Sequence, residues 1–237
     1  STAHLEITAR LLQLPASEFL KSFEIVVQLG AILAVVVVYF SWLRKSFELW
    51  KRIIVSFIPT ALIGFILYSV IKSFLLGNIN VIMWALGIGG VALIIFELIY
   101  RNEDAFGISS QEELEHIPYS TAFLIGVAQA LAVVPGVSRS AATIIAGRVL
   151  GVSRKAIVEF SFLLAIPTML AASGYDIYKN ASTFSSDHLM LLTVGFISSM
   201  VFALAAIKFF LHIIKKRSMI GFGIYRIILA IIIFMAL

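Results

Sequence analysis

The stretch Pro135-Gly136-Val137-Ser138-Arg139-Ser140 interrupts a long apolar run that begins at Tyr119. Proline and glycine end a helix, and Ser138 can then begin the next one as its N-cap. Irregular backbone at membrane depth is tolerated only where protein buries it or where it lines a wet cavity. An arginine at that depth marks a functional site by default. Helix N-terminal N–H groups and the Arg139 guanidinium both favour an anion, so the stretch predicts an anion site, with phosphate as the first candidate.

The composition indicates a membrane protein. Of the 237 residues, 61% are hydrophobic and only 13% are charged, and the mean hydropathy is +1.04. In soluble proteins roughly a quarter of all residues are charged, so this composition predicts a polytopic helical membrane protein. The absence of cysteine excludes a disulfide framework and thiolate chemistry. The net charge of +5 lies mainly in short segments between apolar runs, which is typical of topology determinants and not of nucleic-acid binding.

Several apolar runs are long enough to cross a bilayer, which takes about 20 residues. They are residues 23–42, 53–74, 81–100, 156–175, 188–211 and 220–237. Residues 1–14 are too few to cross. Segment 118–150 contains the Pro-Gly break, and we expect this segment to enter and leave on the same face of the membrane as a re-entrant hairpin. Lys and Arg at 44–52 and 215–217 place those two loops in the cytoplasm.

The two halves of the chain share an order of parts. The cluster Ser1-Thr2-Ala3-His4 leads into a short helix, a turn and a span that opens with Glu24. The cluster Ser138-Arg139-Ser140 leads through the same parts to Glu159, and the interval from His4 to Glu24 equals that from Arg139 to Glu159. This agreement in order and spacing indicates an internal duplication, and the charge pattern predicts that one half is inverted relative to the other.

The predicted fold class is therefore all-α, with one membrane domain over residues 1–237 made of two inverted-topology repeats. Residues 1–100 form the first repeat, residues 101–116 a polar cytoplasmic loop and residues 117–237 the second repeat. Each repeat should hold a re-entrant helix hairpin and about three spanning helices, with a site where the repeats meet. Nothing in the first half corresponds to residues 118–137, so we expect one more hydrophobic segment ahead of Ser1.

The candidate site residues follow from this architecture. Arg139 would clamp phosphate and stabilise the charge on the transferred oxygens. Ser138 could be a nucleophile, a phosphate ligand or a helix cap, and a serine nucleophile would need an adjacent base. Hydroxyls that could bind phosphate, or could equally link helices, belong to Ser1, Thr2, Ser140 and Thr143. Further candidates for substrate binding are Gly136, Gln28, Gln129 and Arg154, and possible supporting carboxylates are Glu24 and Glu159.

Three motifs of this chain resemble motifs of one protein family, and they occur in the same order as in that family. Residues 135–140, with Gly126 and Gln129 upstream and residues 159–165 downstream, resemble the undecaprenyl-diphosphate phosphatase family of bacitracin-resistance membrane proteins. Residues 23–34 resemble the first full span of the same family. Residues 1–5 look like the end of its first motif, a Pro-Val-Ser-Ser-Thr-x-His run. The resemblance covers essentially the whole chain.

The resemblance implies hydrolysis of undecaprenyl diphosphate to undecaprenyl phosphate and inorganic phosphate, which recycles the lipid carrier for bacterial cell-wall synthesis. It also implies a location in the bacterial inner (plasma) membrane, a divalent cation such as Mg²⁺ or Ca²⁺, and a general acid or base role for His4. The family's glutamates ahead of the Ser-Ser-Thr run are not in this chain, so its metal ligands are unknown and its activity as it stands is left open. The alternative is a transporter or flippase for a small anion or a lipid phosphate, and a homodimer is also considered.

Overall fold

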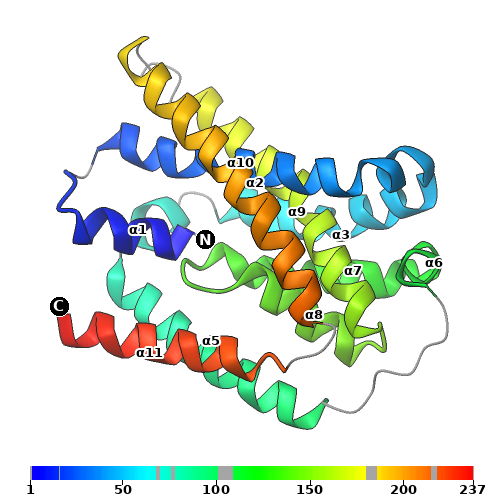
Figure 1. Ribbon diagram of the computed structural model, residues 1–237. Helices are drawn as coiled ribbons and strands as arrows, with labels where there is room; N and C mark the ends of the chain where they lie inside the picture. The colour runs from blue at the N-terminus through cyan, green and yellow to red at the C-terminus, as the bar shows by residue number, and fades with distance from the viewer. Residues whose placement is uncertain are drawn as a thin grey trace. The chain divides into compact units, whose positions relative to one another are not determined.

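All regular secondary structure in the described part of the chain is helical. The computed structural model describes residues 2–15, 17–67, 70–75, 78–100, 109–179, 186–214 and 218–236. Figure 1 traces α1 (Thr2–Leu11), α2 (Glu18–Lys45), α3 (Phe47–Ile66), η1 (Ile71–Leu75), α5 (Ile79–Ile99), α6 (Ser110–His116), α7 (Tyr119–Gln129), η2 (Ala130–Val133), α8 (Arg139–Val149), α9 (Arg154–Lys179), α10 (Ser186–Ile214) and α11 (Ile220–Ala236). The predicted all-α class is confirmed.

Within the described ranges, five helices are long and apolar enough to cross a membrane, which confirms a multi-pass membrane protein. They are α2, α3, α5, α9 and the part of α10 from His188 to Phe209. Helix α6 and the segment Tyr119–Val133 form a pair bent by 98°, which is either a sixth crossing or a re-entrant loop. The last predicted span is a shorter apolar helix, Ile220–Met235.

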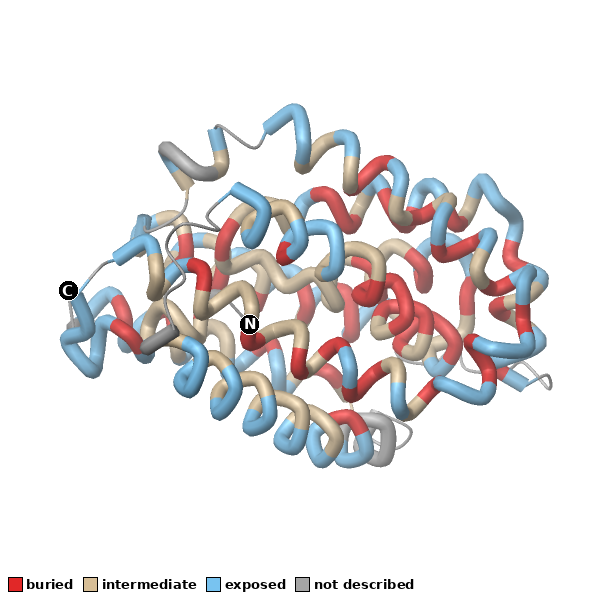
Figure 2. The backbone as a smooth tube through the Cα atoms, turned by 90° about the horizontal axis from the view of Figure 1, so that it is seen from above, coloured by how far each residue is buried: buried red, intermediate tan, exposed pale blue. Residues whose placement is uncertain are grey.

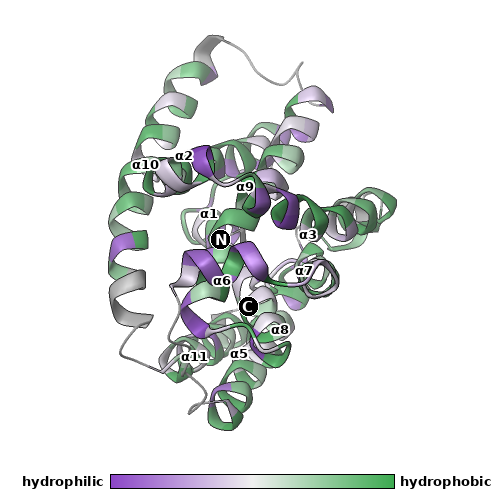
Figure 3. Ribbon diagram, turned by 90° about the vertical axis from the view of Figure 1, so that its right-hand side faces the viewer, coloured by the Kyte–Doolittle hydropathy of each residue, from purple (hydrophilic) through white to green (hydrophobic). Residues whose placement is uncertain are grey.

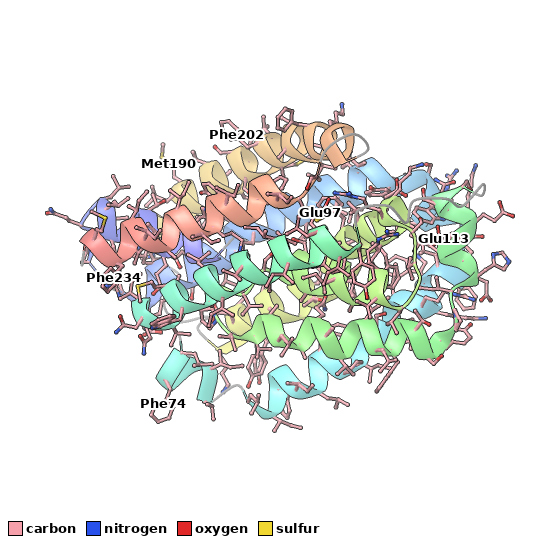
Figure 4. All side chains as sticks on the ribbon, turned by 90° about the horizontal axis from the view of Figure 1, so that it is seen from below. Phe74, Glu97, Glu113, Met190, Phe202 and Phe234 are labelled. Atoms are coloured by element: carbon pink, nitrogen blue, oxygen red, sulfur yellow. The ribbon has the colours of Figure 1, made fainter. Side chains whose placement is uncertain are left out.

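Large apolar side chains are exposed along these helices. Figure 2 shows buried positions alternating with exposed ones along single helices, and Figure 3 shows apolar residues over most of α5, α10 and α11. Figure 4 shows four of the exposed side chains pointing away from their helices, Phe74, Met190, Phe202 and Phe234. A soluble protein rarely exposes such extended apolar faces, so these surfaces suit contact with lipid tails.

The predicted loop at residues 44–52 and the predicted span at residues 53–74 are wrong in their bounds. Helix α2 continues to Lys45 and α3 begins at Phe47, because Ser46 turns the chain and its hydroxyl accepts a hydrogen bond from Leu49 N at 3.1 Å. This N-cap fixes the start of the helix. Helix α3 then ends at Ile66, so the basic residues of the predicted loop lie on helix ends.

The chain divides into two compact units, each with helices from both halves of the sequence. One unit combines Ser1–Lys45 with Ala165–His212, and the other combines Ser46–Leu164 with Ile213–Leu237. The helix order α1, α2, α3, α5 parallels the order α8, α9, α10, α11, which agrees with a duplication. The inversion of one half and the division of a single domain at residues 1–100, 101–116 and 117–237 stay predictions.

Small residues bring the helices of the first unit close together. A Cβ added to Gly30 of α2 would clash with the backbone oxygen of Phe196 on α10, and one added to Gly195 would lie 2.7 Å from a methyl group of Val27. Ser173 of α9 donates to the carbonyl of Ile25 on α2 at 3.3 Å. Close approach of backbones through small residues is the usual way to pack helices in lipid.

The second unit uses the same device at two helix pairs. Helices α5 and α11 lie side by side (Figure 1), and a Cβ on Gly90 would lie 2.7 Å from the carbonyl oxygen of Gly223. Helix α7 packs on α3, where Ser56 donates to the carbonyl of Ala122 and a Cβ on Gly126 would clash with the Ser56 carbonyl. These contacts fix α7 and α5, which flank the Pro-Gly break.

We predict that Gly126→Ala destabilises the protein by about 1–3 kcal/mol, because the new methyl group must separate α7 from backbone atoms of α3. Unfolding by SDS titration of the purified protein would measure the loss. Gly64→Ala on α3 is the matched control, since its Cβ would lie 4.0 Å from the nearest atom, on Val133. Equal stability of the two variants would contradict this account of the packing.

Candidate active site

A tight turn separates η2 from α8. Val137 N donates to the carbonyl of Val134 at 3.1 Å, which closes a four-residue turn around Pro135 and Gly136. Gly136 has a φ of +91°, and proline followed by a residue with positive φ is the arrangement of a type II turn. A Cβ on Gly136 would also lie 2.8 Å from the carbonyl oxygen of Ile82 on α5. Glycine is therefore required here both for the backbone conformation and for close packing.

Ser138 begins α8 as its N-cap. Its hydroxyl accepts a hydrogen bond from Ala141 N at 3.2 Å, and it lies 3.2 Å from the hydroxyl of Ser140. The first N–H groups of a helix have no acceptor within that helix. The N-terminus of α8 therefore gathers hydroxyls and backbone donors at one place, as the sequence predicted for an anion site.

Arg139 is the first residue of α8, and its side chain is half-buried. Its Nη1 atom is buried and has no hydrogen-bond partner among the residues that the structure describes. Burial of an unpaired charged donor is costly, and such donors normally have a partner. A planar guanidinium at this place suits two oxygens of a phosphate or carboxylate.

Thr143 ties the first turns of α8 to α9. Its side chain is fully buried, and its hydroxyl lies 2.8 Å from the Ser161 hydroxyl and 3.0–3.1 Å from the carbonyls of Ser140 and Arg139. Of the two roles expected for Thr143, these contacts are those of a link between helices. They hold the backbone that carries Arg139.

Gln129 has a similar position at the end of α7. It is fully buried and donates from Nε2 to the Thr60 hydroxyl on α3 at 3.1 Å. Thr60 in turn donates to the carbonyl of Gly126 at 2.9 Å. These contacts place Gln129 in the packing of α7 on α3, where it supports the segment ahead of the turn.

The structure does not bring Arg154 and the N-terminus of α8 together. Arg154 begins α9, and its Nη1 lies 3.0 Å from Oε1 of the buried Glu97. Figure 4 labels Glu97. Helix α8 lies between the two places in the chain, and its 11 residues span about 16 Å at 1.5 Å per residue. Glu159 is also engaged elsewhere, because its Oε2 accepts from the Ser110 hydroxyl of α6 at 2.7 Å.

The remaining candidates belong to the first unit. His4 is half-buried on α1, and Gln28 donates from Nε2 to the carbonyl of Glu24 one turn back in α2 at 2.9 Å. Thr2 begins α1, while its side chain, like the whole of Ser1, lies outside the described residues. The site roles of these residues stay predictions.

One residue at the turn escaped the sequence analysis. Arg226 of α11 donates from Nη2 to the carbonyls of Gly136 and Ala85, both at 3.0 Å. A signal existed, because Arg226 is the single charged residue between Ile220 and Ala236. The criterion that singled out Arg139, an arginine at membrane depth, applies equally to it.

The chain is similar to known proteins over nearly its whole length. A family model described as bacitracin resistance protein BacA matches residues 1–232. The chain belongs to the BacA family. Relatives of this BacA chain from Aquifex aeolicus, a Sulfurihydrogenibium species and Persephonella marina are 47%, 48% and 46% identical, over 98% of this chain and 89% of theirs. Each is named undecaprenyl-diphosphatase, so the family resemblance seen in the sequence is confirmed.

The family resemblance implies that a divalent cation binds in the site. No group of three or more His, Cys, Asp or Glu residues that could hold a metal ion occurs within the described ranges. Hard divalent cations need several oxygen ligands, so the described residues of this BacA chain do not make such a site by themselves.

For the ion pair, we predict that Glu97→Leu and Arg154→Leu each destabilise the protein, by about 3–5 kcal/mol, because each strands a buried charge. The double variant should lose less than the two single losses added together. SDS-induced unfolding of the four proteins gives the coupling energy as a double-mutant cycle. Additive losses would show that the two side chains do not interact.

Proposed function

We propose that this chain acts as an undecaprenyl-diphosphatase, which hydrolyses undecaprenyl diphosphate to undecaprenyl phosphate and inorganic phosphate. The observation that carries the proposal is the similarity to relatives of that name over nearly the whole chain. The anion-binding character of the α8 N-terminus supports it. The product would return to cell-wall synthesis, and the protein would lie in the bacterial plasma membrane.

The geometry suits a phosphate group at the start of α8. Backbone N–H groups and the helix dipole attract the charged oxygens, and Arg139 offers a buried donor of its own. Negative charge spreads over the phosphoryl oxygens in the transition state of phosphoryl transfer, so fixed donors lower the barrier. The apolar chain of the substrate would remain in the lipid beside the exposed apolar faces of the helices.

Water is the nucleophile that we propose. The Ser138 hydroxyl contacts Ala141 N and the Ser140 hydroxyl, and neither group is a base of the kind a serine nucleophile requires. Water would form a bond to the terminal phosphorus, while the bond from that phosphorus to the bridging oxygen breaks. Undecaprenyl phosphate leaves with the bridging oxygen, and His4 is the candidate to accept the proton from water.

Transport of an anion or flipping of a lipid phosphate, the alternative from the sequence, is not favoured, because the relatives are named for a hydrolase. The homodimer stays a prediction that the mass of the purified particle in detergent would test.

We predict that Arg139→Ala lowers kcat/KM for phosphate release by about 10²–10³-fold, since it removes a donor to charge that grows in the transition state. Arg139→Lys should retain part of the activity, because lysine keeps the charge and loses the planar fork. The assay is phosphate release from undecaprenyl diphosphate by the full-length protein in detergent. Arg44→Ala, at an exposed position of α2, is the control, and an Arg139→Ala variant as active as this control would refute the assignment.

We also predict that EDTA lowers phosphate release by about tenfold or more, because a divalent cation supplies charge stabilisation that a diphosphate needs. Excess Mg²⁺ should restore the rate, and EDTA already saturated with Mg²⁺ serves as the control. The same assay measures the effect. An unchanged rate in EDTA would remove the cation from this proposal and leave the role of Arg139 standing.

A further inference from the structure

Arg226 connects three segments that lie far apart in the chain. From α11, its Nη2 atom donates to the carbonyl of Ala85 on α5 and to the carbonyl of Gly136 in the turn, both at 3.0 Å. Its side chain is half-buried in an otherwise apolar helix. A desolvated guanidinium is costly unless acceptors surround it. The two carbonyls satisfy Nη2, while the buried Nε has no hydrogen-bond partner among the described residues.

The backbone of α5 leaves room for this contact. A Cβ added to Gly89 would lie 2.5 Å from Arg226 Nη2, which is the very atom that reaches both carbonyls. The adjacent residue, Gly90, allows the close approach of Gly223. The glycines of α5 therefore serve both the packing of α11 and the passage of the arginine to the turn.

A contact at the Gly136 carbonyl acts directly on the turn that leads into α8. It follows Pro135 and precedes the Ser138 cap, so it belongs neither to η2 nor to α8. The turn is already fixed on one side, where Gly136 packs on the backbone of Ile82. The Arg226 guanidinium fixes the turn on another side, through the Gly136 carbonyl. Together these contacts set the direction in which the N–H groups at the start of α8 point.

We propose that Arg226 is a positioning residue, which orients the phosphate-binding N-terminus of α8 by holding the Gly136 carbonyl. It acts through the turn and not by contact with the reacting atoms. The proposal rests on the function proposed above and adds a second arginine to that site. A small displacement of groups that bind a transition state costs about 10²-fold in rate, so loss of this contact should lower kcat.

The first test variant moves the Arg226 side chain away from the Gly136 carbonyl and leaves Arg226 itself in place. In Gly89→Ala the new methyl group meets the far end of a flexible side chain, so the helix is retained while Nη2 moves off the carbonyl. Gly87→Ala on the same helix is the matched control, since its Cβ would make only an ordinary contact of 3.7 Å with Ala230. Arg226→Lys is the second variant, because one ammonium group cannot reproduce the fork.

Two readouts are needed, with the full-length protein in detergent. Hydrogen–deuterium exchange of the peptide covering residues 134–143 should be faster in Gly89→Ala and in Arg226→Lys than in the wild type and in Gly87→Ala. The kcat of phosphate release should fall by about tenfold or more with little change in KM. A purely structural arginine would lower the melting temperature and leave kcat of the folded protein unchanged.

Unchanged exchange in residues 134–143 would overturn the proposal, whatever happens to kcat, because the turn would then not depend on Arg226. Faster exchange with an unchanged kcat would overturn it too, since the turn would move without consequence for the reaction. If the wild type releases no phosphate from undecaprenyl diphosphate, the proposed function fails. The exchange result would still decide whether Arg226 holds the turn.

Discussion

A peptide group within a membrane must find its hydrogen bonds inside the protein, and the break at Pro135 and Gly136 depends on meeting that requirement. Val137 N closes the turn on the Val134 carbonyl, Ser138 caps α8, and Arg226 takes up the Gly136 carbonyl. These contacts leave the N-terminus of α8 and, on the two arginines at the turn, two buried donors without a partner among the described residues, Nη1 of Arg139 and Nε of Arg226. The donors that an anion would use are those that the fold itself does not consume.

The packing around the break follows from the same requirement. Glycines at α5–α11 and at α3–α7 bring backbones close enough for side chains to reach carbonyls on the neighbouring helix. Ser56, Thr60 and Arg226 make such contacts with Ala122, Gly126 and Ala85. Apolar contact alone distinguishes poorly between a helix and a lipid tail, so these polar contacts give the second unit its specific arrangement.

The sequence predicted the helical class, most spans and the start of α8, because hydropathy and the Pro-Gly-x-Ser signal act locally. It missed the one-residue junction at Ser46, since a cap hydrogen bond can replace the loop that a run of basic residues suggests. It gave Arg154 as a candidate for substrate binding and Glu159 as a possible supporting carboxylate. Their partners Glu97 and Ser110 come from distant segments that spacing cannot reveal. Arg226 was within reach of the sequence, because a lone charge in an apolar helix is visible without a structure.

The central claim is that the N-terminus of α8 holds the diphosphate. The most direct measurement is an experimental structure of the full-length protein with an undecaprenyl diphosphonate, in which a methylene group replaces the bridging oxygen. We expect density for a phosphonate against the N–H groups of residues 138–140, within hydrogen-bonding distance of Arg139. A headgroup bound elsewhere, with Arg139 engaged by a protein side chain, would contradict it.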